Sequence, residues 1–308
     1  MPMHLTKHCC PRFRLLSAAA IATLGLVVPA AGAQANAPKV FSHADTLRGS
    51  NTPQRAWWDA TFYDLHVRVN PADSSIRGYN GITYRVTSKP QEMQIDLQVP
   101  MQIDSIVQAG QRLEFRRDSN AFFVTITEPQ KAGDFQTLTV HFHGKPRAAS
   151  RPPWDGGYIW QRDSVGNRWI STANQGLGAS VWWPNKDLQA DEPDSQRVAI
   201  TVPDPMIDVS NGRLRSTVKN ADGTTTYEWF VASPINNYSI SVNAGTYAHW
   251  TEIYDGLNGK LTMDFWPLAS HLGEAKKQFT QARPMIACFE SWFGPYPGYK
   301  DGYKLMEG

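Results

Sequence analysis

Residues 63–69 read Tyr63-Asp64-Leu65-His66-Val67-Arg68-Val69, with apolar and polar side chains in strict alternation. Successive side chains of a β-strand point to opposite faces of a sheet, so this spacing predicts a strand with one buried and one solvated face. The same alternation recurs along the chain. It is found at residues 82–86, 93–99, 138–142, 198–202, 227–231 and 238–242. The sequence therefore predicts one mainly β domain over residues 55–260, built from two packed sheets.

Short turn signals separate many of these segments. Asn-Gly and Asp-Gly pairs favour tight turns because both residues accept a positive φ at little cost. Such pairs occur at residues 80–81, 211–212 and 222–223. We expect the chain to reverse direction at each of them.

The apolar spacing changes after Pro267 from two residues to three and four, which is typical of a helix. The residues with this spacing are Phe279, Ala282, Ile286, Phe289, Trp292 and Phe293. They predict a helix over residues 270–293 with Ser270 as its N-cap. Pro284 lacks an amide hydrogen and clashes with the preceding turn, so we expect a kink or break near residues 281–283.

The first 33 residues have the three parts of a secretory signal peptide. Three basic residues precede an apolar run at residues 15–28, and Ala31-Gly32-Ala33 suits cleavage after Ala33. A stable bilayer span needs roughly 20 apolar residues, so a retained membrane anchor is the less favoured alternative. We expect export to the periplasm or the extracellular space, no membrane association after cleavage, and a loose, flexible leader over residues 34–54.

The net charge argues against a nucleic-acid-binding protein, and the cysteine content shows how the fold must be stabilised. Cleavage after Ala33 changes the formal net charge from +2 to −1, since three basic and no acidic side chains are lost. A nearly neutral chain without basic runs has no general attraction for phosphate backbones, so we expect no nucleic-acid partner. Cys288 is the one cysteine that remains, so stability must come from an apolar core and not from intramolecular disulfides.

Three ordered blocks stand out in the C-terminal half of the chain. The first runs from Asn174-Gln175-Gly176 through Trp182-Trp183-Pro184 and Asp187 to Asp191-Glu192-Pro193-Asp194, and the second covers residues 233–246. The third comprises residues 292–297 with the sequence Trp-Phe-Gly-Pro-Tyr-Pro, followed by Asp-Gly-Tyr-Lys at residues 301–304. Together the blocks resemble the secreted bacterial branch of the aminopeptidase N family of zinc metallopeptidases, the gluzincins.

This resemblance implies a fold and an activity. It implies a saddle-like N-terminal β-sandwich domain over residues 55–260, then the opening helix and strands of a truncated thermolysin-like α/β catalytic domain over residues 261–308. The implied function is that of the N-terminal part of a secreted zinc aminopeptidase, which cleaves N-terminal residues from peptides. Its implied partner is a peptide substrate with a free N-terminus.

The chemistry of that family depends on motifs that these 308 residues do not contain. The family uses a G-x-M-E-N loop for the substrate amino group, and H-E-x-x-H with a later Glu for zinc and for general-base catalysis. We therefore expect no catalytic residue and no zinc in this chain, and no activity from it alone. If the reading frame continues past Gly308, the protein is the complete enzyme; if it stops there, it is an inactive relative with an exposed apolar helix face.

One substrate-binding position of the family maps onto this chain, namely Gln175. The resemblance implies that its side-chain carbonyl accepts a hydrogen bond from the substrate's N-terminal ammonium, which offers only donors. Without the resemblance, Gln175 is interpreted as an exposed loop residue beside Gly176 and Gly178.

Other residues allow competing interpretations. His141 and His143 share one strand face and could form one edge of a metal site. Because the sequence shows no third ligand, the favoured interpretation is two polar residues on the solvated face of the strand. A group of carboxylates at Asp187, Asp191, Glu192 and Asp194 lacks the spacing of a calcium loop, so we expect turn capping.

Eleven tryptophans suggest the alternative of a secreted β-sandwich carbohydrate-binding module without catalytic activity. In the Trp182-Trp183 pair, one ring is expected to face the core and the other to face outward.

Overall fold

The computed structural model describes residues 41–152 and 155–308, within which Ser42–Gly308 forms one compact unit. The predicted signal peptide, its cleavage site after Ala33 and the first part of the predicted leader lie outside the described residues. Within the described ranges, no helix is both long enough and apolar enough to cross a membrane.

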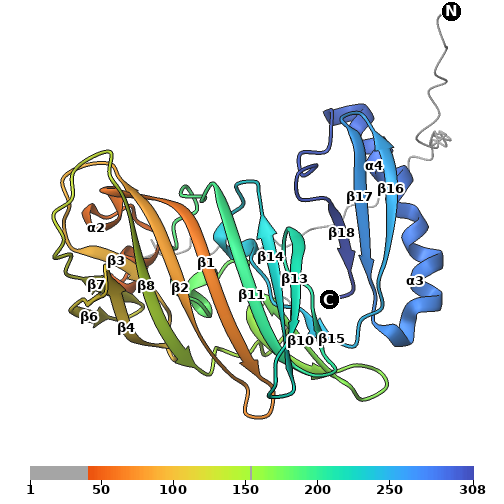
Figure 1. Ribbon diagram of the computed structural model, residues 1–308, viewed down its shortest axis with the longest axis horizontal. Coiled ribbons are helices and arrows are strands. Elements are labelled where there is room, and N and C mark those ends of the chain that lie inside the picture. The colour runs from red at the N-terminus through yellow and green to blue at the C-terminus, as the bar shows by residue number, and fades with distance from the viewer. Residues whose placement is uncertain (1–40, 153–154) are drawn as a thin grey trace, which may run out of the picture. The chain divides into compact units, whose positions relative to one another are not determined.

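The largest sheet has eight strands in the order β13-β14-β11-β1-β2-β8-β4-β5 (Figure 1). Its strands are β1 Trp58–Asn70, β2 Ser75–Val86, β4 Gln102–Gln108, β5 Gln111–Arg112, β8 Phe135–Gly144, β11 Ser195–Pro203, β13 Arg213–Lys219 and β14 Thr224–Val231. Neighbours pair antiparallel except β1 and β11, which are parallel with Leu65 opposite Val198. The alternating residues of β1 follow the prediction, since Leu65 and Val67 are buried while His66 and Arg68 are partly exposed.

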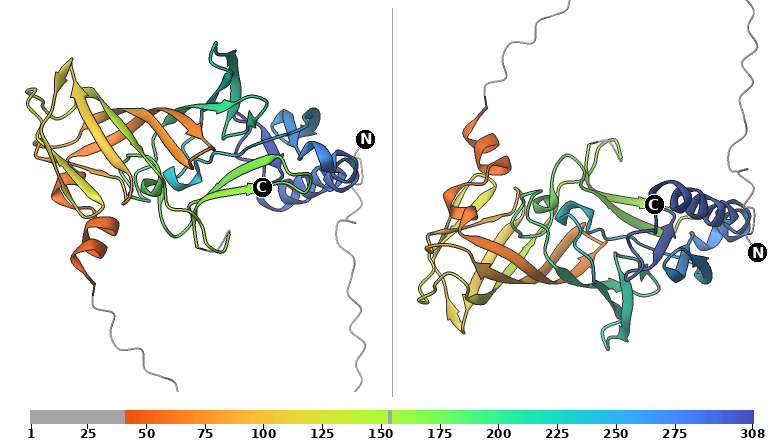
Figure 2. Two further views of the ribbon diagram at one scale, coloured as in Figure 1. Left: turned by 90° about the horizontal axis from the view of Figure 1, so that it is seen from below. Right: turned by 90° about the horizontal axis from the view of Figure 1, so that it is seen from above.

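Two smaller sheets complete the β domain. One has the order β12-β15-β10-β9, and the other has the order β3-β7-β6. Their strands are β3 Met93–Asp96, β6 Phe115–Asp118, β7 Ala121–Val124, β9 Gly157–Arg162, β10 Arg168–Ala173, β12 Ile207–Asp208 and β15 Ala244–Gly245. Figure 2 shows β9 and β10 across the core from β1 and β2, and one apolar cluster joins all three sheets. The mainly β fold is confirmed, with three sheets in this domain where two were predicted.

The C-terminal part adds a sheet with the order β16-β17-β18 and a pair of helices. Its elements are β16 Trp250–Gly256, β17 Gly259–Trp266, η3 Ala269–His271, α3 Leu272–Gln278, η4 Phe279–Gln281, α4 Ala282–Phe293 and β18 Tyr303–Met306. Leu261, Met263 and Phe265 of β17 pack against Ala282 and Ile286 of α4. This contact buries one face of the helix against the sheet.

The predicted helix over residues 270–293 is interrupted just before Pro284, as expected. The 3-10 turn η4 separates α3 from α4, because Pro284 cannot donate a hydrogen bond to the preceding turn. The N-cap prediction was wrong: Ser270 lies inside η3, and α3 begins after His271 without a side-chain cap.

Two local predictions in the β domain were also wrong. Asn80-Gly81 does not turn the chain but lies inside β2, where the buried Asn80 amide donates to the Pro184 carbonyl at 2.8 Å. Residues 238–242 are not a strand, since the chain forms the 3-10 turn η2 Asn237–Ser239 there. The turns at residues 211–212 and 222–223 are confirmed, with Gly212 at φ 72° and Gly223 at φ 74°.

The loose leader predicted over residues 34–54 is wrong where helices form, at residues 43–49 and from residue 53 onward. Helix α1 His43–Gly49 begins with a reciprocal capping box between Ser42 and Asp45, and helix α2 is Pro53–Ala56. Arg55 of α2 is fully buried and forms an ion pair with Asp96 at 2.5 Å, which fixes this segment to β3.

Candidate functional site

Gln175 lies on an exposed turn directly after β10. The amides of Leu177 and Gly178 donate to the Asn174 carbonyl at 3.1 and 2.9 Å, which closes the turn. The carbonyl of Gly176 accepts from the Arg48 guanidinium of α1. The backbone around Gln175 is therefore held on both sides, while its side chain faces solvent.

Asn174 connects this turn to the second sequence block. Its buried amide nitrogen donates to the carbonyls of Tyr238 and Ile240 at 3.3 and 3.1 Å. These bonds satisfy two carbonyls that a strand at residues 238–242 would have paired in a ladder, which explains why no strand forms there. The turn that carries Gln175 is thus hydrogen-bonded through Asn174 to the segment of residues 236–243.

Capping was predicted for all four carboxylates of the acidic group, and the hydrogen bonds of Asp187 and Asp191 support it for these two. The Asp187 carboxylate accepts from the Ser180 amide and hydroxyl at 3.2 and 2.6 Å. The Asp191 carboxylate accepts from the Ala60 amide at 3.2 Å and from the Lys186 ammonium. Both carboxylates therefore stabilise the loop that follows the Gln175 turn.

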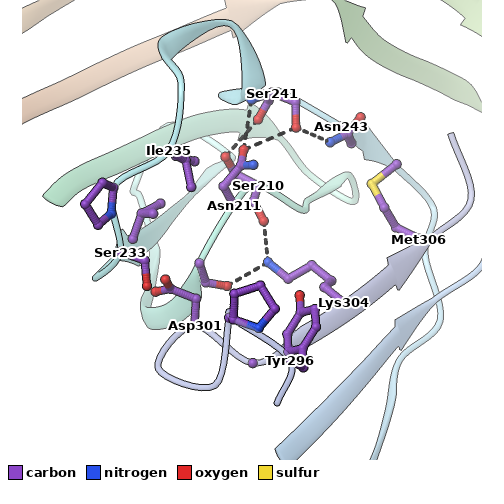
Figure 3. A pocket seen from close by; sticks show the side chains of 16 residues that line it. Ser210, Asn211, Ser233, Ile235, Ser241, Asn243, Tyr296, Asp301, Lys304 and Met306 are labelled. Atoms are coloured by element: carbon purple, nitrogen blue, oxygen red, sulfur yellow. Dashed lines mark hydrogen bonds between the residues drawn. The ribbon is translucent and has the colours of Figure 1, made fainter. Parts of the chain in front are cut away.

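A pocket of about 470 Å³ lies where the second and third blocks meet (Figure 3). Turn residues of the β domain form one wall, and residues 296–306 form the other. Lys304 of β18 extends across it: its ammonium donates to the carbonyls of Ser210 and of Gly212, the latter at 2.8 Å. The same ammonium lies 3.9 Å from the centre of the Trp229 ring.

The buried Asp208 carboxyl and the Lys304 ammonium both contact the Trp229 side chain. The Trp229 indole donates to one Asp208 oxygen at 3.0 Å. Burial raises the pKa of Asp208 to about 8, although the indole and the Lys304 charge act in the opposite direction. Burial likewise lowers the pKa of Lys304 to about 8. Burial therefore disfavours the charged form of both side chains.

The structure brings together some predicted residues and separates others. Ser233, Ser241 and Asn243 of the second block meet Asp301 and Lys304 of the third block around the pocket. Gln175 is not among the residues that line it, and is connected to it only through Asn174 and the segment after Tyr238. Sequence reasoning missed Asp208, because an Asp between Ile207 and Val209 is typical of an ordinary solvated strand position.

His141 and His143 lie on the exposed face of the eight-stranded sheet. His143 pairs with Asp104 at 2.7 Å, and the His141 ring lies 5.7 Å from the Tyr79 ring. Among residues 41–152 and 155–308, no group of three or more His, Cys, Asp or Glu side chains could hold a metal ion.

The Trp182-Trp183 pair does not present a ring to solvent. Both side chains are fully buried, and Trp183 packs edge-on against Tyr63 at 5.2 Å between ring centres. The prediction that one ring faces outward was wrong, because the chain after η1 Ala179–Val181 runs through the core between the sheets. These rings cannot stack on a sugar.

Comparisons with known proteins found similarity in structure only. No protein-family profile and no curated protein matches the chain. A two-domain M1 zinc metallopeptidase bound to L-arginine aligns with a TM-score of 0.68 and 19% identity, over 82% of this chain and 56% of that one. The M1 zinc metallopeptidase of Deinococcus radiodurans bound to a Tyr-Ser-Ala substrate aligns with a TM-score of 0.67 and 20% identity, over 82% and 57% of the two chains.

Leukotriene A4 hydrolase from Saccharomyces cerevisiae is a more distant neighbour, with a TM-score of 0.60 and 14% identity over 82% of this chain and 38% of that one. The chain thus spans a little over half the length of the M1 structures it matches. Over about four-fifths of its residues, it has the fold of these M1 zinc metallopeptidases.

Proposed function

We propose that this chain is the N-terminal part of an exported zinc aminopeptidase that removes N-terminal residues from peptides. The observation that carries the proposal is the combination of the β domain with the helix and sheet that follow it, which aligns as one piece with M1 zinc metallopeptidases. The three sequence blocks support it independently of the fold.

Zinc belongs to this proposal only through the part of the relatives that the chain does not span. The described residues offer no three-ligand group for a metal, so they do not fit a zinc site. We derive no catalytic step from them and expect no peptidase activity from these 308 residues alone.

Within the proposal, Gln175 binds the substrate's ammonium group. Its backbone is held by Arg48 and Asn174, so the side chain is presented from a fixed turn. A fixed acceptor loses less conformational entropy when it binds than a mobile one. The Tyr-Ser-Ala and L-arginine complexes of the neighbours show that M1 structures accept ligands with a free amino group.

The first test is the nucleotide sequence after codon 308. We expect codons for G-x-M-E-N and then H-E-x-x-H in one of the three forward frames. A stop codon without these motifs downstream would leave an inactive relative and contradict the peptidase assignment.

The second test uses the longer protein with leucine and alanine anilides as substrates. We expect hydrolysis that a zinc chelator abolishes. Gln175→Ala should raise KM about 10-fold or more, because a hydrogen bond to a charged group contributes about 1.5–3 kcal/mol. Gln175→Glu keeps an acceptor and serves as the matched control; an unchanged KM in Gln175→Ala would refute the assigned role.

The proposal includes export and cleavage after Ala33. The composition of residues 1–33 supports it, with basic residues before an apolar run and small residues before the cleavage point. N-terminal sequencing of the exported protein should begin at Gln34. A mature protein that begins at Met1 would refute this assignment.

A further inference from the structure

Three side chains from separate segments meet beside the C-terminal sheet in the order serine, histidine, carboxylate. The Ser164 hydroxyl lies 3.1 Å from Nε2 of His271, and Nδ1 of His271 lies 2.6 Å from the Glu307 carboxylate. A nucleophile within hydrogen-bond reach of a base, which is itself oriented by an acid, is the arrangement that activates serine in hydrolases.

Glu307 is held firmly enough to orient the imidazole. Its second carboxylate oxygen accepts from the Leu268 amide at 2.9 Å. Its backbone is fixed on both sides, since its amide donates to Trp266 at 3.0 Å and its carbonyl accepts from the Tyr247 hydroxyl at 3.0 Å. The carboxylate therefore favours the tautomer of His271 with its hydrogen on Nδ1, which leaves Nε2 free to accept the serine proton.

Ser164 is presented from a rigid hairpin tip between β9 and β10. The Asp163 carboxylate accepts from the amides of Val165 and Asn167 at 3.1 and 2.8 Å. The Gly166 amide donates to the Asp163 carbonyl at 3.0 Å. These bonds fix the turn, and Ser164 remains exposed at its tip together with a His271 side chain that is 40% exposed.

We propose that Ser164, His271 and Glu307 form a nucleophilic site that accepts acyl or phosphonyl groups from small activated esters. Ser164 Oγ attacks the acyl carbon while its proton passes to His271 Nε2. The bond to the leaving alcohol breaks, and the leaving group takes that proton. Water then cleaves the serine ester by the same route, and the carboxylic acid is released.

The surroundings of Ser164 define the class of substrate. Oxyanion stabilisation usually requires two backbone amides near the nucleophile. The amides of Val165 and Gly166 are already bonded to Asp163, so they do not supply this pair. The site therefore suits esters with good leaving groups, and not amides or alkyl esters.

The reaction requires neutral His271, which makes it sensitive to pH. The hydrogen bond and charge of Glu307 raise the pKa of His271, and Glu274 and Asp163 act in the same direction. We expect the rate to increase with pH through a value above the 6.5 of an ordinary histidine.

The experiment labels the purified chain with a fluorophosphonate probe and locates the adduct by peptide mass spectrometry. Ser164 attacks phosphorus and fluoride leaves, so the adduct reports the nucleophile directly. We expect modification of Ser164 that increases with pH, and hydrolysis of p-nitrophenyl acetate with the same pH profile. Ser164→Ala should remove both, and His271→Ala should lower both about 100-fold or more, the usual contribution of a general base.

Glu307→Gln separates activation from mere packing. The amide keeps the size of the side chain but can donate to Nδ1, which moves the imidazole hydrogen to Nε2 and removes the base. We expect a loss similar to that of His271→Ala with an unchanged circular dichroism spectrum. Ser88→Ala, at an exposed turn serine, is the matched control and should leave labelling intact.

Two outcomes would overturn the proposal. One is labelling of Ser164 that is absent or no faster than that of other exposed serines. The other is labelling that persists unchanged in His271→Ala or Glu307→Gln. The reaction needs no metal, so a zinc chelator should not affect it, and its failure would leave the aminopeptidase proposal untouched.

Discussion

The substitution Glu290→Gln tests how the C-terminal helix is attached. Glu290 lies on α4 and is 4% exposed. One carboxylate oxygen accepts from the Tyr296 amide at 3.0 Å and the Tyr299 hydroxyl at 2.8 Å. The other accepts from the Leu257 amide at 3.0 Å and the Tyr254 hydroxyl at 3.1 Å. A single carboxylate thus joins α4 to the β16–β17 turn and to the segment before β18.

The cost of Glu290→Gln follows from these donors. Glutamine replaces one acceptor oxygen by a donor, so at least one backbone amide and one hydroxyl lose their partner. The hydroxyl can rotate and accept, but the amide cannot. A buried donor without a partner costs about 1–3 kcal/mol, so we expect a loss of about 1–3 kcal/mol in the free energy of unfolding.

The pH dependence of this loss is a second, independent check. Burial raises the pKa of Glu290, but hydrogen bonds from Tyr296, Leu257, Tyr299 and Tyr254 outweigh it and lower the pKa overall. A carboxylate with a lowered pKa stabilises the fold above its unfolded pKa of about 4.5, and this contribution is lost as the pH falls through the folded value. The difference between wild type and Glu290→Gln should therefore be full at pH 7 and should diminish below pH 4.5.

Urea unfolding followed by tryptophan fluorescence measures both effects. Glu274→Gln, at an exposed position of α3, is the matched control and should change the free energy of unfolding by less than about 0.5 kcal/mol. A loss below 0.5 kcal/mol for Glu290→Gln, or an equal loss at pH 7 and pH 3.5, would refute the assigned role of the four donors.

Three further predictions can be tested, two by the same urea unfolding and one by binding of a hydrophobic dye. Gly178→Ala should lower the free energy of unfolding by about 2–4 kcal/mol more than Gly176→Ala. Both glycines have a positive φ, but a Cβ added at residue 178 meets a carboxylate oxygen of Asp187 at 2.1 Å, whereas one added at residue 176 meets nothing within 4 Å. Equal losses in the two variants would contradict this. Asp208→Asn should raise the free energy of unfolding by about 2 kcal/mol at pH 8 but not at pH 4. Because the pKa of Asp208 is raised in the folded state, the wild type loses stability as the pH rises from 4 towards 8, and asparagine does not ionise. An effect that is the same at both pH values would show that ionisation of Asp208 is not the cause. The purified chain should bind a hydrophobic dye at Trp292 and Phe293, which are 74% and 83% exposed. Replacing both residues by serine should reduce the fluorescence of the bound dye. A wild-type chain that does not increase the dye fluorescence would contradict the prediction.

Strands with one solvated face could be predicted from the sequence. In β1, β8 and β11, polar residues alternate with buried apolar ones, so the period is visible without tertiary information. The break before Pro284 was also predictable, since it follows from the covalent structure of proline.

Segments that are stabilised by distant side chains could not be predicted in this way. Residues 238–242 alternate like a strand, but their carbonyls bond to Asn174, about 65 residues earlier. Asn80-Gly81 resembles a turn, but the Asn80 amide finds a partner at Pro184. The local pattern contains neither partner, so it favours the wrong structure.

The candidate site likewise contains residues that could be predicted from the sequence and residues that could not. The blocks with Gln175, Ser233 and Lys304 were recognisable as sequence, and the structure connects all three through hydrogen bonds or a shared pocket. Asp208 and the group around Ser164 were not recognisable. Their properties depend on burial and on contacts between residues that lie about 100 apart in the chain.

The parallel pairing of β1 with β11 has a consequence for synthesis of the chain. β1 ends at Asn70, but the strand that covers its second edge begins only at Ser195. Until that strand has left the ribosome, β1 keeps a row of unpaired amides and carbonyls open to other chains. Contacts between residues so far apart also slow folding, because a long loop must close first. Fragments that end before residue 195 should therefore aggregate more readily than the full chain, because the second edge of β1 stays unpaired in them.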